Sequence, residues 1–486
     1  MSSRRYIYRL MNTPYFSAWQ STLAAYGRRS AQHRCAAEIE NEFAHILSSD
    51  LLSQGAGSRK RTFTTKRTFW CFLWQVLQPW TACRAVVRKV QAELETQNKH
   101  IAENSSAYCQ ARARLEITLL HKGMQQSASS ADKLAVNGVP GWQRPVKVVD
   151  ATSFQTPDTP SNRKKYHYPT GQKKGCGFPV MRALAIFSLV GGAIHEIVTA
   201  ACYTSELAMF KPLWQTLHRG DILLGDRIYG CFSLLCALPL RGIDVVARLH
   251  QGRRLDLRRA EKLGPGDWLT TLPKPYTMPQ TMKAREWKAL PATASVRIIR
   301  SRLEVKGFRT KTVWIVTTLL DARLYPTTAI TDLYLRRWQM ELSFRDLKTT
   351  LGMESLRCLS PQMIEKEIRM FIIAHNCLRA LMAEAAVTYH IPRQRISFKG
   401  TMDTIRSFHL VMLGARSQRS LNRMRVRMIA IIAADRLPLR PGRSEPRAVK
   451  KRPKPYPMLT KPRRQFKENP HNGNPRPCKR LQIILT

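Results

Sequence analysis

Two short apolar segments, each ending in an aspartate, constrain the fold of this chain most. Residues 146–150 read Val-Lys-Val-Val-Asp, and residues 221–226 read Asp-Ile-Leu-Leu-Gly-Asp. Short apolar runs of this kind are typical of buried strands. Neighbouring strand ends are where an α/β sheet gathers the side chains of a site. Asp150 and Asp226 are therefore candidate site residues, although aspartate at such a position is also an ordinary turn residue.

The sequence between these two segments predicts the rest of a mixed α/β core. Residues 181–189 and 194–201 have the pattern of two strands, joined through the glycines at 191 and 192. This arrangement predicts a hairpin. Ser205 is placed to cap a helix that runs to Leu217. The order strand, hairpin, helix, strand is that of a mixed α/β core.

Residues 1–142 are expected to form a helical domain. Apolar residues repeat at helical spacing over residues 68–77, and Thr81 is placed to cap a second helix. Arg84 and Arg88 lie four positions apart on that second helix. Two interpretations are open, because one sequence specifies helix-turn-helix geometry poorly. The segment is either a compact DNA-binding unit or a structural helix pair with a solvated basic face.

The second half of the chain returns from strands to helices. Residues 243–320 are strand-rich around a polar, proline-broken middle, which predicts an all-β insertion. Helical spacing begins at residue 327 and continues to about 351. Ser360-Pro361 opens a further helix, in keeping with proline at the first helical position. Helices are also expected between residues 400 and 434.

These patterns predict an α/β domain over residues 143–398, a helical region over 399–434 and a tail over 435–486. Beyond Asp435 the tail is rich in Pro, Arg and Lys, with only Glu445 and Glu468 as acids. Such a segment cannot bury a core, so we expect it to be disordered. Two roles are open for the tail: a nonspecific anchor on the DNA backbone, or a solvated segment without contacts.

The charge of the chain points to a polyanionic partner. Its 486 residues include 80 Lys and Arg against 33 Asp and Glu, a formal net charge of +47. The apolar stretch around residues 183–194 is too short to span a bilayer, and no secretion signal follows the first methionine, so a cytoplasmic protein without a membrane partner is expected. Eleven cysteines without a C-x-x-C pair indicate reduced thiols rather than a zinc knuckle or disulfides.

One helical segment carries the strongest chemical pattern. At about 100° per residue, Tyr334, Arg337, Glu341 and Lys348 fall within roughly a 60° arc of an α-helix. One face then presents an aromatic ring, two cations and a carboxylate, which suits an anionic substrate. A structural interpretation is also open, since Glu341 is spaced to pair with Arg337 or Arg345.

Three carboxylates from separate elements match one kind of chemistry. Phosphoryl transfer by two metal ions about 4 Å apart needs hard oxygen ligands that converge from several elements. Asp150 and Asp226 from strands and Glu341 from a helix supply such ligands.

These residues resemble the signature of a known family. The spacing Y-x2-R-x3-E-x6-K, filled by Tyr334, Arg337, Glu341 and Lys348, resembles the YREK signature of bacterial insertion sequence 4 transposases. The Asp-Arg-Ile-Tyr run from Asp226 is similar to that family's motif at its second acid. The Asp-Ala-Thr run from Asp150 resembles the first, where Gly or Ser often replaces Ala. The resemblance covers roughly residues 145–400.

The resemblance implies an RNase H-like fold and a DDE site of Asp150, Asp226 and Glu341 that binds two Mg2+ ions, with Mn2+ as a substitute. It also implies a β-rich insertion between the second Asp and the Glu, where the strand pattern independently places one. Terminal inverted repeats and target DNA become the expected partners, with a homodimer that joins two ends and acts at the bacterial nucleoid. Some related groups cut through hairpin ends.

The resemblance also implies DNA contacts by Tyr334, Arg337 and Lys348. Trp314 is placed like a family tryptophan that stacks on a flipped base, which is physically reasonable for a distorted DNA end. Core packing of Trp314 is the alternative, since strand aromatics usually pack.

Two rival functions are weighed against transposition. A noncatalytic, architectural nucleic-acid-binding protein needs only the charge of +47 and the basic tail, and it leaves the signature spacing unexplained. A structure-specific nuclease on the same fold shares the acids without joining DNA. Inverted repeats flanking the coding region favour transposition over both.

Overall fold

The described part of the chain covers most of the predicted elements. The computed structural model describes residues 40, 42–48, 50–53, 61–95, 98–135, 139, 141–170, 177–250, 252, 255–302, 312–412, 417–438 and 465. The predicted disordered tail lies almost wholly outside these residues, as does the start of the predicted N-terminal domain.

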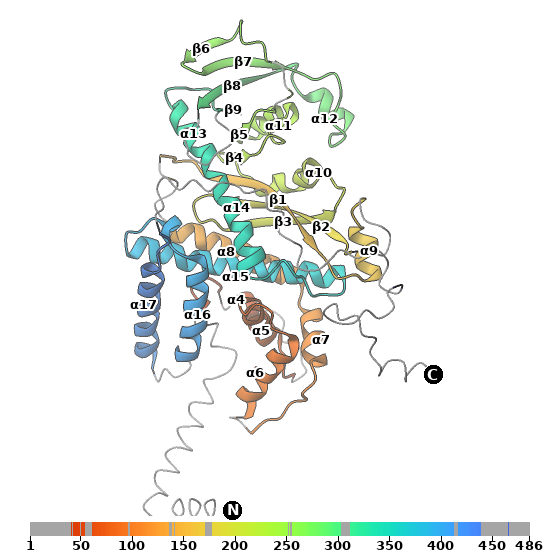
Figure 1. Ribbon diagram of the computed structural model, residues 1–486, viewed down its shortest axis with the longest axis vertical. Coiled ribbons are helices and arrows are strands. Elements are labelled where there is room, and N and C mark those ends of the chain that lie inside the picture. The colour runs from red at the N-terminus through yellow and green to blue at the C-terminus, as the bar shows by residue number, and fades with distance from the viewer. Residues whose placement is uncertain are drawn as a thin grey trace, which may run out of the picture.

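A single mixed sheet organises the described residues (Figure 1). Its nine strands follow the order β3-β2-β1-β4-β5-β9-β8-β7-β6. The pairs β1–β4 and β4–β5 are parallel and the other pairs are antiparallel. The predicted mixed α/β class is confirmed. The strands are β1 Val146–Gln155, β2 Val180–Ser188, β3 Ile194–Ala201, β4 Ile222–Gly225, β5 Asp244–Arg248, β6 Glu261–Gly264, β7 Asp267–Pro273, β8 Thr293–Arg302 and β9 Thr312–Thr317.

Strand β1 is longer than the sequence predicted. It does not end at Asp150 but continues to Gln155, and Gln155 pairs with Val180 of β2. The ladder to β2 overrides the turn preference of aspartate, and Phe154 buries its ring from this extension. Asp150 therefore lies in the middle of a strand, whereas Asp226 directly follows the end of β4, as predicted.

The insertion is a continuation of the central sheet. The strand over 244–248 belongs to the core, because β5 pairs in parallel with β4, and β9 then pairs with β5. Strands β6 to β9 extend the sheet at the upper end of Figure 1. The prediction of an all-β insertion is wrong in one detail, since α12 (Ala284–Ala289) lies between β7 and β8.

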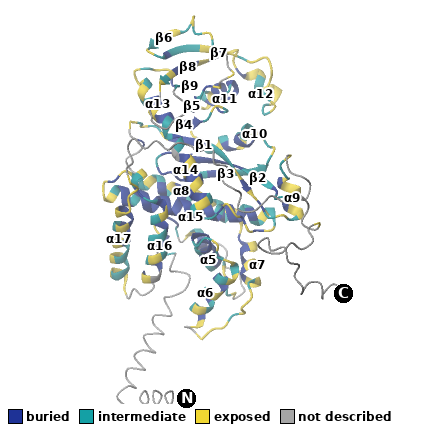
Figure 2. Ribbon diagram, viewed as in Figure 1, coloured by how far each residue is buried: buried dark blue, intermediate teal, exposed yellow. Residues whose placement is uncertain are grey.

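Helix α15 (Pro361–Thr388) forms the centre of the helical layer. Ser360 caps it by accepting a hydrogen bond from the backbone N–H of Met363, as its sequence predicted. The helix is long and apolar enough to cross a membrane, but 83% of its apolar window is buried inside the fold. Figure 2 shows α15 largely buried, whereas α16 and α17 carry exposed faces. We therefore interpret α15 as the core helix, against which α8 packs.

The remaining helix predictions are confirmed in position, with two corrections. Thr81 does not cap the second N-terminal helix, which begins at Cys83. Ser205 does cap its helix, but the α-helix ends at Phe210 and a 3-10 segment follows, because proline at 212 cannot continue the hydrogen-bond ladder. The other α-helices are α4 Asp50–Ser53, α5 Thr65–Leu77, α6 Cys83–Glu95, α7 Ser106–Arg114, α8 Ile117–Leu134, α9 Pro160–Tyr166, α10 Glu206–Phe210, α11 Phe232–Ala237, α13 Thr327–Arg336, α14 Trp338–Arg345, α16 Phe398–Met412 and α17 Gln418–Ala434.

The cysteines of the described part are free thiols, as predicted. Four of them are buried, at positions 71, 236, 358 and 377, which fits their role as core residues.

A buried ion pair fastens the insertion to the helix that follows it. Arg297 on β8 is fully buried, and its Nε lies 2.7 Å from Oδ1 of Asp267 on β7. The Arg297 guanidinium also donates to the carbonyl of Tyr325, at 2.6 Å. Thr327, the first residue of α13, donates to the Asp267 carboxylate at 2.7 Å. The start of α13 is thus fixed relative to the insertion.

Replacing Arg297 with Met should lower the free energy of unfolding by about 3–5 kcal/mol, because the Asp267 carboxylate would stay buried without its partner. Urea denaturation measures the loss. Arg302→Met, at an exposed position on the same strand, is the matched control and should change stability by less than about 0.5 kcal/mol. Equal effects of the two substitutions would contradict the anchoring role of Arg297.

Candidate metal and DNA-cleavage site

The register of the sheet sets two aspartates side by side. In the parallel pair β1–β4, Val148 lies opposite Leu224. Two residues further along, Asp150 and Asp226 reach the same level on neighbouring chains, which lie about 4.8 Å apart in a sheet. Asp150 accepts a hydrogen bond from the N–H of Ala151 at 3.0 Å, and Asp226 accepts one from the N–H of Ile228 at 2.8 Å. Each carboxylate thus keeps further acceptor positions for a ligand.

Glu341 reaches the same region from helix α14, which packs against β1. Asp150 and Glu341 line one pocket of about 380 Å³, together with Lys348 and Glu354. Asp226 is not among the residues that line it. The structure therefore brings Asp150 together with each of the other two predicted acids, by the sheet register on one side and by the pocket on the other.

The electrostatics of Asp150 agree with this crowding. The pKa of Asp150 is raised to about 6, mainly by burial and in smaller part by the negative charges of Glu341 and Asp226. The positive charge of Arg337 and the hydrogen bond from Ala151 oppose the increase. Three like charges near one another favour a bound cation, which would remove their mutual repulsion.

The three acids fit a divalent cation by ligand type, since hard cations prefer carboxylate oxygens. Their arrangement is open, however: within the described residues, no three acid, His or Cys side chains are close enough to hold one ion. The side chain of Glu341 is 58% exposed, and its Oε1 lies 3.6 Å from Nη2 of Arg337. The i, i+4 pairing that the sequence left open is thus present.

The predicted cationic face is partly buried. The helix is interrupted at Arg337, between α13 and α14, so the ideal arc does not hold over its whole length. Tyr334 and Arg337 are only 4% and 9% exposed, and the Arg337 guanidinium lies 6.0 Å from the centre of the Tyr334 ring. The Nε of Arg337 is buried and has no hydrogen-bond partner among the described residues. Lys348 is half-buried in the pocket wall. Burial lowers the pKa of its ammonium, although the negative charge of nearby Glu354 opposes the decrease.

A buried cluster behind the pocket was not found from the sequence. The helix widens to a π-helix over Asp346–Thr350, the segment that carries Lys348. Arg379 of α15 contacts the Asp346 carboxylate at 2.8 Å and the Ser343 hydroxyl at 3.2 Å. These bonds attach the pocket helix, which consists of α14 and the π-helical segment Asp346–Thr350, to the core helix α15. The only signal in the sequence was an arginine within the apolar run of α15.

Trp314 lies on β9, which is separated by β5 from β4, the strand that precedes Asp226. Its ring stacks on Trp268 of β7 with the ring centres 5.9 Å apart, and the Arg300 guanidinium lies 5.7 Å from the ring centre. The ring is half-buried and packs in part against the insertion core. The packing alternative for Trp314 thus has direct support, while base stacking stays a prediction.

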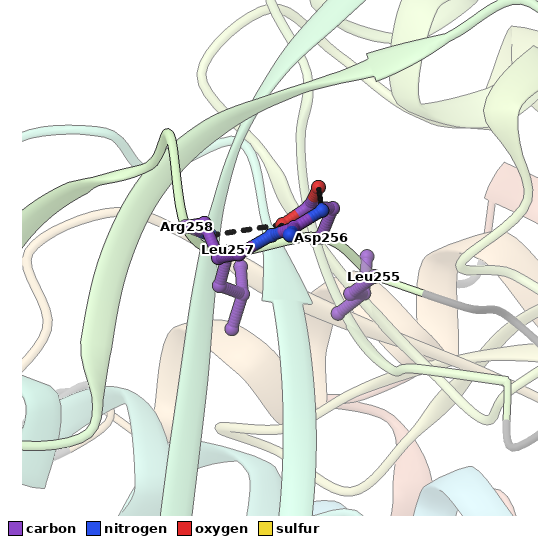
Figure 3. Close-up of a pocket in the computed structure, with 4 residues that line it drawn as sticks. All are labelled: Leu255, Asp256, Leu257 and Arg258. Carbon is purple, nitrogen blue, oxygen red and sulfur yellow. Dashed lines mark hydrogen bonds and ion pairs between the residues drawn. The ribbon is translucent and has the colours of Figure 1, made fainter.

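A second hollow of about 650 Å³ lies at residues 255–258 of the insertion (Figure 3). Its charged groups are Asp256 and Arg258, which pair with each other at 2.7 Å. The hollow therefore offers no converging set of reactive groups.

Comparison with known proteins identifies the family. Residues 141–377, which include all three acids, match the family model of the transposase DDE domain. The chain is 25% identical over 408 residues to the transposase InsG for insertion sequence element IS4 of Escherichia coli (strain K12), with 83% of this chain and 89% of that protein covered. The chain thus carries a transposase DDE domain and is similar over most of its length to an insertion sequence 4 transposase. A putative transposase InsZ of the same organism is 27% identical over 175 residues, 35% of this chain and 58% of that protein.

Among solved structures, the cryo-EM structure of a piggyBac transposase synaptic complex with hairpin DNA is similar at a TM-score of 0.38 and 10% identity, over 83% of this chain and 86% of that one. This likeness is too low to add to the argument.

The domain match and the similarity to the insertion sequence 4 transposase support an RNase H-like core within the mixed sheet and a DNA transposase. The protein binds DNA and cuts and joins it with divalent metal ions, as DDE transposases do.

The stability of the metal-free transposase should depend on the protonation of Asp150. Its folded pKa of about 6 lies above that of an exposed aspartate, roughly 3.9. The stability that the protonated carboxyl contributes is full below about pH 3.9 and is lost as pH rises through about 6. Asp150→Asn lacks this loss, so in EDTA its stability relative to wild type should increase between pH 4 and pH 6.5.

Urea denaturation across this pH range measures the difference, and Asp332→Asn, at an exposed position of α13, is the control. A difference between Asp150→Asn and wild type that stays constant with pH would contradict the assignment.

Proposed function

We propose that Asp150, Asp226 and Glu341 are the metal ligands of a cut-and-paste transposase that acts on the ends of its own insertion sequence. One observation carries this assignment: the parallel register of β1 and β4 sets Asp150 beside Asp226, while Asp150 shares a pocket with Glu341. The charge of each of the other two acids affects the pKa of Asp150. The structure-specific nuclease shares this site, so joining activity separates the two functions.

The ligand set suits two Mg2+ ions, with Mn2+ as a substitute, because all three ligands are hard carboxylate oxygens. When bound, such ions supply Lewis-acid stabilisation of the attacking and leaving oxygens. Asp150 is the natural shared ligand, since it neighbours both other acids. Glu341 completes the site when it leaves Arg337, which frees that guanidinium for a phosphate.

The reaction conserves phosphodiester bonds during joining. In cleavage, a water oxygen forms a bond to phosphorus and the DNA 3′ oxygen leaves with a proton. In strand transfer, that 3′-hydroxyl attacks a target phosphodiester, so one ester forms as another breaks. No covalent bond to the protein is needed. Cleavage through hairpin ends would also form one phosphodiester as another breaks, with a hydroxyl of the opposite strand as the nucleophile.

The proposed role of each DNA-contact residue depends on how far its side chain is buried. Lys348 lies in the pocket wall and contacts a phosphate next to the scissile one. Arg337 reaches the same phosphates through its terminal nitrogens, and the buried Tyr334 ring holds the guanidinium in place. Trp314 lies on the insertion, where a flipped base would have to displace the Arg300 side chain from the ring.

The proposed domains keep the boundaries that the sequence predicts. Residues 1–142 form the DNA-binding domain, 143–398 the catalytic domain with its insertion, and 399–434 the C-terminal helices, followed by the basic tail over 435–486. Terminal inverted repeats and target DNA are the substrates. Two DNA ends must be brought together, so a homodimer is expected in the DNA complex. The enzyme would act in the bacterial cytoplasm at the nucleoid.

Asp150→Ala should reduce cleavage of a terminal-repeat duplex in Mg2+ by at least about 100-fold, since even loss of an outer-shell partner costs a metal site 10- to 100-fold. Binding of the duplex should be largely retained. A gel-based cleavage assay beside a mobility-shift assay measures both activities. Asp332→Ala, at an exposed position of α13, is the control. Full cleavage by Asp150→Ala would remove Asp150 from the site.

Lys348→Ala should weaken binding of the same duplex and make its dependence on salt shallower. The slope of log K against log salt should fall in magnitude by about 0.9, the value for one lost phosphate contact. Titrations at several salt concentrations measure the slope. Lys288→Ala, at an exposed position of α12, should leave it unchanged. An unchanged slope for Lys348→Ala would show that Lys348 makes no phosphate contact.

A further inference from the structure

An exposed tryptophan occupies a strained turn between helices α5 and α6. Trp80 is 70% exposed, and its backbone has a φ of +69°. A bulky residue other than glycine is a genuine outlier in this region of backbone space. Outliers of this kind cluster where structure serves function, and burial does not account for this one. Trp80 is not part of the site described above.

The turn is fixed to the segment that follows the pocket helix. The guanidinium of Arg357 lies 5.7 Å from the centre of the Trp80 ring. Arg357 also donates from Nη1 to the carbonyl of Thr81, at 2.9 Å. Pro79 faces Gly352, where an added Cβ would only just be in van der Waals contact with it, and the φ of +78° at Gly352 forms the turn that leads out of the helix. These contacts hold the indole outward and leave the rest of its surface open.

The same segment, residues 352–358, borders the pocket. Glu354 lines the pocket together with Asp150 and Glu341. Ser355 forms a parallel bridge with Gln155, at the end of the strand that carries Asp150. A single short segment thus contacts both the Trp80 turn and the candidate cleavage site.

The surface around the turn is basic. Arg84 and Arg88 are exposed on the first two turns of α6, and Arg357 is exposed beside the indole. No ion pair of Arg84 or Arg88 is found within the described part of the chain. The acids on α6 pair elsewhere, since Glu93 binds Lys89 and Glu95 binds His100. Exposed cations beside an open aromatic ring match the surfaces that bind nucleic acid.

We propose that Trp80, Arg357, Arg84 and Arg88 form a DNA-contact surface beside the cleavage pocket. The open face of the indole stacks on a base or deoxyribose of the DNA end, and the three arginines contact phosphates. This inference rests on the proposed function, because it takes the terminal DNA as the ligand. A protein partner fits less well, since a single ring among cations is not the apolar patch that protein interfaces bury.

The first test removes the ring without changing charge. Trp80→Ala should weaken binding of a fluorescein-labelled duplex, made from the terminal repeat that flanks the coding region, by about 5- to 100-fold. The salt dependence should keep its slope, because no phosphate contact is lost. Trp80→Phe retains a ring and should recover most of the affinity. Tyr276→Ala removes another fully exposed ring, on the insertion, and should have no effect.

The second test removes charge without removing the ring. The double variant Arg84→Gln, Arg88→Gln should lower the magnitude of the salt slope by about 1.8, which is two contacts at about 0.9 each. Arg285→Gln, Lys288→Gln, on the exposed face of α12, is the matched control. Thermal unfolding of each variant establishes that it is folded, and the double arginine variant keeps the surface testable even if Trp80→Ala unfolds.

Unchanged duplex affinity in folded Trp80→Ala, or an unchanged slope in the double arginine variant, would overturn the proposed surface. Loss of self-association without DNA, measured by light scattering, with duplex affinity intact would overturn it in favour of a protein contact.

Asp150→Ala, tested in parallel, keeps the two proposals separate. If wild type binds and cuts the duplex while Trp80→Ala binds it equally well, only the surface fails. If wild type binds the duplex with the predicted Trp80 dependence but never cuts it, only the proposed cleavage activity fails.

Discussion

The structure depends on one unfavourable arrangement: two carboxylates at the same level on adjacent parallel strands, with a third approaching from a helix. Burial of Asp150 and the charges of Asp226 and Glu341 raise the pKa of Asp150 to about 6. In the metal-free chain this repulsion is relieved in part by Arg337, which also holds Glu341 at 3.6 Å. A cation between the acids would relieve it better, because it places positive charge closer to all three.

The rest of the fold holds the three elements in place against this repulsion. Strands β1 and β4 are fixed by their ladder at the centre of the sheet. The pocket helix is held from behind by Arg379 of the buried helix α15, through Asp346 and Ser343. At its other end, the start of α13 is tied to the insertion through Asp267 and Arg297. Rigid support on both sides is what a metal site needs, since ligands must converge within a fraction of an ångström.

Much of this arrangement was predictable, and the exceptions have physical reasons. The strand pattern before Asp150 and the helical spacing around Glu341 are local signals, so both elements were predicted correctly. The length of β1 was not, because pairing with β2 overrides the local turn preference of aspartate. The burial of Tyr334 and Arg337 also escaped prediction, since an ideal helical arc says nothing of which neighbours cover it. Arg379 and the Trp80 turn were missed because their partners lie on other elements, 33 and 36 residues away for Arg379 and 276 residues away for the bond between Thr81 and Arg357.

The most direct test of this account is to locate the metal. Anomalous scattering from crystals of the transposase with Mn2+ and a terminal-repeat duplex would place each ion without reference to activity. The account predicts manganese between Asp150 and Asp226, with Glu341 turned away from Arg337 and coordinating an ion of the same cluster. Manganese bound elsewhere, or Glu341 still paired with Arg337 while the DNA end is in place, would contradict it.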